Sequence, residues 1–187
     1  MILIGGCSGE RTPGGVVPSG GPPVIVPAGP GETARTATPG QTVAPERRPN
    51  AADVRFAEAM IEHHRAALDM AALVAGRSES EAVIALAARI RFSQQPEISW
   101  LTTWLAGLGR TVAHGGSHDL GELRAVRGSA FDRLFVTRMI THHEAALDLA
   151  LAETRAGSDA GVRRLAADIE QSQGMEIDRM RAMLARF

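Results

Sequence analysis

From residue 50 onward, apolar and polar positions alternate with the spacing of an α-helix. In four stretches, apolar side chains recur every three or four residues and therefore share one face of a helix. The pattern predicts helices over residues 51–75, 80–107, 130–155 and 159–186. Because one buried stripe on each of four helices is typical of a four-helix bundle, we expect an all-α fold.

The second half of this region repeats the first at an offset of 79 positions, without a gap. Several polar and apolar positions recur: Met60 and Met139, His63-His64 and His142-His143, Gln94 and Gln173, Glu97 and Glu176. Such extended self-similarity indicates a duplicated supersecondary unit. We therefore predict one bundle domain over 50–187, made of two helical hairpins at 50–108 and 129–187.

The connection between the hairpins, residues 109–128, is about twenty residues long, whereas antiparallel neighbours in bundles usually need only two to eight. Twenty extended residues can cover the roughly 40 Å length of a 27-residue helix. The connection therefore favours a crossover along the bundle, as in ferritin-like folds, with a short helix near Arg124. An up-down-up-down bundle with a wandering loop is the alternative.

Capping residues mark where the helices begin. Asn50 and Ser129 each stand three residues before an aspartate, and Ser78 stands three residues before a glutamate. Ser158 with the following acid opens the last helix, and Gly76 and Gly157 mark the two hairpin turns.

Composition narrows the class of protein. The 187 residues carry 20 Lys+Arg against 21 Asp+Glu, a net charge of −1, so a nucleic-acid partner is not expected. Aromatic residues make up only 4%, and the single Cys excludes an internal disulfide and a Cys-based metal site. No run of about 18 apolar residues is present to span a membrane.

The N-terminal region resembles the start of an exported lipoprotein. Gly5-Gly6-Cys7 follows a short apolar stretch, as in a lipobox, so residues 1–7 are interpreted as a remnant of a signal with Cys7 as the lipidation site. Residues 8–49 are rich in Pro and Gly and predict a disordered tether. We therefore expect an extracytoplasmic protein held to the membrane of the cell envelope only by lipid; a fortuitous Gly-Gly-Cys is the alternative.

A polar layer interrupts the apolar stripes at the same height in both hairpins. In an antiparallel hairpin, residues equally far from the turn lie at the same height. Counted from the first turn, centred on Ser78, Met60 and His63 lie at the height of Gln94 and Glu97. The same count in the second hairpin levels the equivalent residues Met139, His142, Gln173 and Glu176. Since His63 lies near the middle of its helix, a pseudo-two-fold axis would bring both sets together at mid-bundle. Adjacent histidines differ by about 100° of helix rotation; we expect His63 to point inward and His64 to flank the seam.

Buried carboxylates and imidazoles are costly unless they pair or bind a cation, so the layer predicts a metal site. Thioether and imidazole donors favour copper, particularly Cu(I), while zinc or iron would also suit imidazole and carboxylate. The glutamines are expected to orient the ligands, and His–Glu pairs that satisfy each other without metal are the alternative. His114 and His118 could form a separate surface site. No catalytic motif is found, and the carboxylates are too few for a di-iron oxidase, so an enzyme is not expected.

These motifs resemble the signature of the domain-of-unknown-function-305 family. The resemblance covers residues 50–187 and rests on Phe56-x-x-x-Met60-Ile61-x-His63-His64, its copy at Phe135–His143, and the two Gln-x-x-Glu-Ile segments. Its members are mostly exported bacterial proteins of the ferritin superfamily, some implicated in copper binding. The resemblance implies a ligand set of His63, His64, His142, His143, Met60 and Met139. Leu101 and Met183 depart from the family pattern, and the crossover lacks the methionines often found there.

Two hypotheses follow. The first is a lipid-anchored envelope protein that sequesters copper or confers tolerance to it, with any protein partner unknown. The second is a metal-free helical adaptor whose His/Glu layer fixes the register of the helices.

Overall fold

The computed structural model describes residues 24–26, 35–37, 48–112 and 119–187, in two units, 1–47 and 48–187. In the first unit, β1 (Val24–Val26) pairs antiparallel with β2 (Arg35–Ala37), and Ile25 lies opposite Thr36. The predicted tether did not include these strands, whose β-branched residues suit a pleated pairing. Cys7 lies outside the described residues, so its lipidation stays a prediction. Among the helices described, none combines the length and apolar character that crossing a membrane requires.

The second unit is the predicted helical bundle. Its four long helices are α1 (Ala51–Ala72), α2 (Glu81–Gly107), α4 (Gly128–Ala156) and α5 (Ala160–Leu184). A fifth, short helix, α3 (Gly121–Ala125), lies in the connection, where a short helix was expected. The all-α class and the four predicted helices are confirmed.

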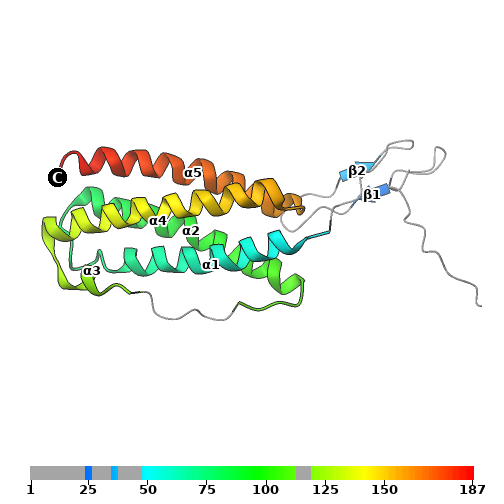
Figure 1. Ribbon diagram of the computed structural model, residues 1–187, viewed down its shortest axis with the longest axis horizontal. Helices are drawn as coiled ribbons and strands as arrows, with labels where there is room; N and C mark the ends of the chain where they lie inside the picture. Colours follow the sequence, from blue (N-terminus) through cyan, green and yellow to red (C-terminus); the bar gives the residue numbers. More distant parts are fainter. Residues whose placement is uncertain (1–23, 27–34, 38–47, 113–118) are drawn as a thin grey trace, which may run out of the picture. The chain divides into compact units, whose positions relative to one another are not determined.

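Helix α2 ends at one end of the bundle and α4 begins at the other (Figure 1). The backbone N–H of Gly128, where α4 begins, donates to the carbonyl oxygen of Arg77 in the α1–α2 turn, at 2.7 Å. At the opposite end, Nδ2 of Asn50 donates to the carbonyl oxygen of Ala156, at 2.9 Å. Helix α4 therefore runs antiparallel to α1. This is the ferritin-like order, and the up-down-up-down alternative is wrong.

The predicted cap residues hold at α1 but not at α2 or α4. At α2 the cap position is Ser80, which makes no side-chain cap bond, so the prediction of a Ser78 cap is wrong. The Asn50 side chain accepts from the backbone of Ala52 and Asp53, and Asp53 accepts in return from the Asn50 N–H, a complete capping box. Helix α4 begins one residue before Ser129, with Arg127 at the cap position and no side-chain cap bond. The hydrogen bond from Gly128 to the neighbouring turn starts this helix instead, so the prediction of a Ser129 cap is wrong.

Helix α2 contains a proline, Pro96, without ending there. Proline lacks the N–H that would bond to the carbonyl oxygen of Phe92, one turn earlier. Both residues lie on the solvent-exposed face of α2, and Phe92 is 86% exposed. Water can therefore hydrate the freed carbonyl, which explains why the helix continues.

Candidate metal centre

The core consists of two hydrophobic clusters, one toward each end of the bundle. On α1, Ile61 belongs to one cluster and Ala67 to the other. On α2, Ile98 belongs to the first of these clusters and Ile90 to the second. The second repeat is divided at the equivalent places. The residues between the clusters are the two His-His pairs on α1 and α4 and the two Gln-x-x-Glu segments on α2 and α5. The predicted polar layer therefore crosses the middle of the bundle.

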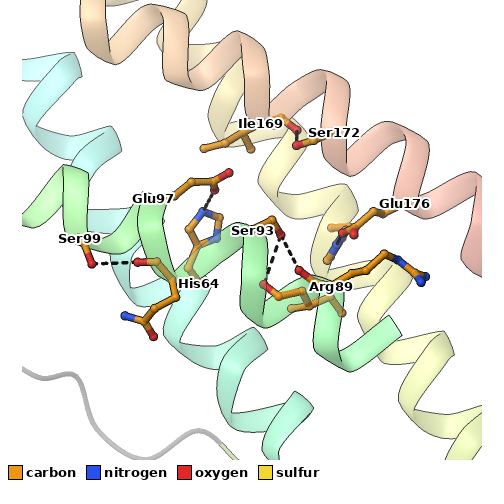
Figure 2. Close-up of polar contacts among 11 residues, drawn as sticks. His64, Arg89, Ser93, Glu97, Ser99, Ile169, Ser172 and Glu176 are labelled. Carbon is orange, nitrogen blue, oxygen red and sulfur yellow. Dashed lines mark hydrogen bonds and ion pairs between the residues drawn. The ribbon is translucent and has the colours of Figure 1, made fainter. Parts of the chain in front are cut away.

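Within each hairpin, one histidine pairs with the glutamate of the adjacent helix. Nε2 of His64 lies 2.6 Å from Oε2 of Glu97 (Figure 2). Nε2 of His143 lies 2.8 Å from Oε2 of Glu176. Both histidines are 0% exposed. The expectation that His63 points inward and His64 flanks the seam is therefore wrong: the second histidine of each pair is the more buried one. The reason is the rotational setting of α1 and α4, which turns this residue toward its own hairpin partner.

The first histidines of the two pairs meet each other across the α1–α4 interface. The ring centroids of His63 and His142 are 3.6 Å apart, and both rings are half-buried. Nε2 of His63 lies 2.9 Å from the carbonyl oxygen of His142. Since a carbonyl oxygen only accepts, Nε2 of His63 carries the proton and donates it.

Burial keeps both of these rings neutral. It lowers the pKa of His63 to about 4, with the neighbouring His64 adding to the effect. Burial likewise lowers the pKa of His142 to about 2, with His63 as the next largest cause. A neutral His63 ring with its proton on Nε2 carries a lone pair on Nδ1, the form in which imidazole binds metal ions.

The layer contains an unusual concentration of buried polar atoms without partners. Nδ1 of all four histidines has no hydrogen-bond partner, and neither does the side-chain oxygen or nitrogen of Gln94 and Gln173. Buried polar side-chain atoms in folded proteins are normally paired with protein or ordered water. Unpaired Nδ1 atoms in both repeats therefore indicate that the layer accommodates a further species.

The donor chemistry fits a borderline or soft metal ion, although the side chains do not form a closed site. Among the described residues, no three His, Cys, Asp or Glu side chains come close enough together to hold one ion. Met60 and Met139 are fully buried but belong to opposite hydrophobic clusters, so they do not meet in one central group. Imidazole nitrogen, amide oxygen and thioether sulfur are donors that copper accepts.

The two glutamates occupy a different position from the one expected of direct ligands. Glu97 and Glu176 face the Nε2 atoms of their histidines, on the side of each ring away from Nδ1. A carboxylate there orients the ring and raises the basicity of the other nitrogen. The sequence already contained a signal for this pairing, because Glu97 lies 33 residues after His64 and Glu176 lies 33 residues after His143. His114 and His118 lie outside the described residues.

Comparisons with known proteins place these features in a family. The family model described as "Domain of unknown function (DUF305)" matches residues 53–118 and 113–184. The search of curated proteins gives no match. A fragment of a DUF305 protein from Deinococcus radiodurans has a similar structure, with a TM-score of 0.67 and 27% identity over 74% of this chain and 99% of that one.

Several solved structures of the protein CopM are also similar. CopM in the Cu(I)-bound form has a TM-score of 0.66 and 31% identity, over 72% of this chain and 96% of that one. CopM in the Cu(II)-bound form is 30% identical, with the same TM-score and the same coverage of both chains. The family match spans both repeats and most of the bundle. The chain therefore belongs to the DUF305 family.

Proposed function

We propose that this protein binds copper through the mid-bundle layer and sequesters or relays the ion without catalysis. The observation that carries the proposal is the set of four buried imidazole Nδ1 atoms without partners, two from each repeat. Copper takes imidazole nitrogen readily. The similarity to CopM, whose structures include Cu(I)-, Cu(II)- and Ag-bound forms, supports a soft metal ion, with copper as the physiological candidate.

Each part of the layer has its own role in this proposal. The side chains of His63, His64, His142 and His143 supply Nδ1 donors. Glu97 and Glu176 hold two of the rings through Nε2, so they position ligands rather than bind the ion. Met60 and Met139 lie about one helical turn before the histidines, where a thioether would favour Cu(I) over zinc or iron. Gln94 and Gln173 have amide groups free to contact the ion or its water.

We also propose that the protein works outside the cytoplasm, anchored by lipid on Cys7. The Gly5-Gly6-Cys7 sequence and the Pro/Gly-rich segment that follows it support this location. In the envelope, a protein that holds copper would lower the amount of free ion that reaches the cell, which is the basis of copper tolerance in this proposal.

A specific observation favours a second candidate, a metal-free helical adaptor. Two of the four histidines already pair with glutamates, and no three ligating side chains converge within the described residues. In that case the layer would act as a polar network that fixes the register of the helices.

Copper loading of the full chain, purified without an affinity tag, separates the two candidates. We expect stoichiometric copper by elemental analysis after desalting. We also expect the melting temperature to rise on the order of 10 °C at 100-fold excess over the dissociation constant, because such binding stabilises by about 2.7 kcal/mol. The double variant His63→Ala/His142→Ala should lose both effects. The matched control, His114→Ala/His118→Ala, should keep them. A wild-type melting temperature that copper leaves unmoved, with the layer variant changing stability alone, would favour the adaptor.

A further inference from the structure

A second buried polar group lies at the end of the bundle where α1 begins, well away from the histidine layer. Asp53, in the first turn of α1, is 0% exposed and accepts hydrogen bonds from groups in the turn between α4 and α5. The backbone N–H of Ser158 donates to Oδ1 at 2.9 Å, and that of Asp159 donates to the same oxygen at 3.0 Å. Oδ2 accepts from the N–H of Asn50 at 2.6 Å. The Ser158 hydroxyl lies 3.1 Å from the same oxygen but donates its single proton to the carbonyl oxygen of Arg48, at 2.7 Å. Three backbone N–H donors mark Asp53 as an ionised carboxylate.

The carboxyl group of Glu153, in the last turn of α4, lies beside Asp53. Glu153 is only 2% exposed, and no N–H or O–H group of the described residues donates to either of its side-chain oxygens. A methyl group added to Gly157 would lie 1.9 Å from Oε1 of Glu153 and 2.8 Å from Oδ1 of Asp53. Both carboxyl groups therefore press against the same face of Gly157.

We propose that Glu153 is a proton-binding site: in the folded protein it is a neutral carboxylic acid that donates its proton to the Asp53 carboxylate. Two buried carboxyl groups in contact cannot both ionise without a large cost, and one shared proton removes the repulsion. The proton belongs on Glu153, because Asp53 accepts from three N–H groups and Glu153 from none. The pair links the first turn of α1, in repeat one, to the end of α4 and the α4–α5 turn, in repeat two.

The charges around the pair agree with this assignment. Burial is the largest cause that raises the pKa of Glu153 to about 8. The hydrogen bond to Asp53 and the negative charge of Asp53 raise it further. From α5, Arg163 opposes this rise and Asp159 adds to it. From α1, Arg55 lines the same groove of about 310 Å³ as Glu153. Burial alone would raise the pKa of Asp53, but its hydrogen bonds lower it below the usual 3.8.

The position of this proton determines how stability depends on pH. The folded-state pKa of Glu153 lies above the ordinary value of 4.5, so the folded protein holds one proton more than the unfolded chain between about pH 4.5 and 8. The stabilisation from the pair is complete below about pH 4.5 and is lost as the pH rises to about 8. Over this interval the unfolding constant should rise by up to about tenfold per pH unit, relative to a chain that cannot titrate here.

Urea unfolding of the full chain at pH 5, 6, 7, 8 and 9 tests the proposal, with Glu153→Gln as the variant that cannot titrate. The ratio of the wild-type unfolding constant to that of Glu153→Gln should rise steeply from pH 5 to 8 and level off by pH 9. The histidine titrations are common to both proteins and cancel in the ratio. A ratio that stays constant across the whole range would overturn the proposal.

Two further measurements keep the test decisive if Glu153→Gln folds poorly. A carbon NMR titration of the wild-type Glu153 carboxyl group should report a neutral acid at pH 6 and a midpoint near pH 8; a carboxylate at pH 6 would refute it. Gly157→Ala should displace Glu153 and abolish the pH dependence. The control Gly174→Ala, whose added methyl meets nothing within 4 Å, should retain it. Neither result depends on copper binding.

Discussion

The two repeats of this protein are most alike at the middle of the bundle and least alike at its ends. At the middle, His64 with Glu97 and His143 with Glu176 form the same pair within 0.2 Å in length (2.6 and 2.8 Å). At the ends, repeat two has Glu153 where repeat one has Val74. The layer takes the same side chains from both halves, and there His63 of repeat one contacts His142 of repeat two. At an end of the bundle, different residues can cover the core, so the two repeats can differ there.

The hairpin turns differ in the same way. Gly76 in the first turn has a φ of +74°, which favours glycine for its backbone freedom. Gly157 in the second turn has a φ of −69°, accessible to any residue, and glycine is needed there because the Glu153 carboxyl group occupies the space of a side chain. Glycine therefore allows a positive φ in the first turn, whereas in the second turn it leaves room for a neighbouring side chain.

The largest expected difference between the repeats concerns their outer helices. Leu86 on α2 is 0% exposed, whereas its equivalent on α5, Leu165, is only partly buried. Leu86→Ala should lower the free energy of unfolding by about 2–5 kcal/mol because it leaves a cavity in the core. Leu165→Ala should cost about 1 kcal/mol, since less apolar area leaves water. Urea unfolding at one pH measures both, and equal costs would mean that the two outer helices pack equivalently.

An intermediate difference is expected at the starts of α1 and α4. Asn50→Ala removes the capping box and the hydrogen bond to the carbonyl oxygen of Ala156, so it should cost about 1–2 kcal/mol. Ser129→Ala, at the equivalent position, should change stability by less than about 0.5 kcal/mol, because Ser129 lies inside α4 and caps nothing. Thermal unfolding of both variants is the measurement. A loss of 1 kcal/mol or more for Ser129→Ala would restore the cap predicted from the sequence.

The smallest effect is expected on the outer face of α2. Phe92 is 86% exposed, and the equivalent position in repeat two carries Gln171, also exposed. Phe92→Gln should therefore alter the free energy of unfolding by less than about 0.5 kcal/mol. A loss above 1 kcal/mol in the same thermal assay would show that Phe92 is buried against another surface in solution.

Much of this architecture could be predicted from the residues. The 3.6-residue period located all four long helices, and the length of the 109–128 connection favoured the crossover that the structure contains. The offset of 79 brought the polar residues of both repeats to the same height. These predictions succeeded because helical periodicity and loop reach are local properties of the chain.

Other features could not be predicted in this way. Two adjacent histidines straddle the edge of each apolar stripe, and the prediction that His63, not His64, points inward is wrong because periodicity does not distinguish such neighbours. The capping of α4 was mispredicted because a backbone bond to the α1–α2 turn, not a side chain, begins that helix. Glu153 was missed because it follows no repeat pattern and no metal or catalytic motif.

The amino-acid sequence by itself determined the helices, their duplication and the height at which polar side chains interrupt the core. The tertiary structure alone decided the rotation of α1 and α4, and with it the pairing of His64 and His143 with glutamates and the contact between the rings of His63 and His142. It also decided that the carboxyl groups of Asp53 and Glu153 lie together against Gly157. The physical reason is that periodicity fixes which face of a helix is apolar only to within about one residue, or 100° of rotation. Packing between helices sets the remaining angle and brings together groups far apart in the chain.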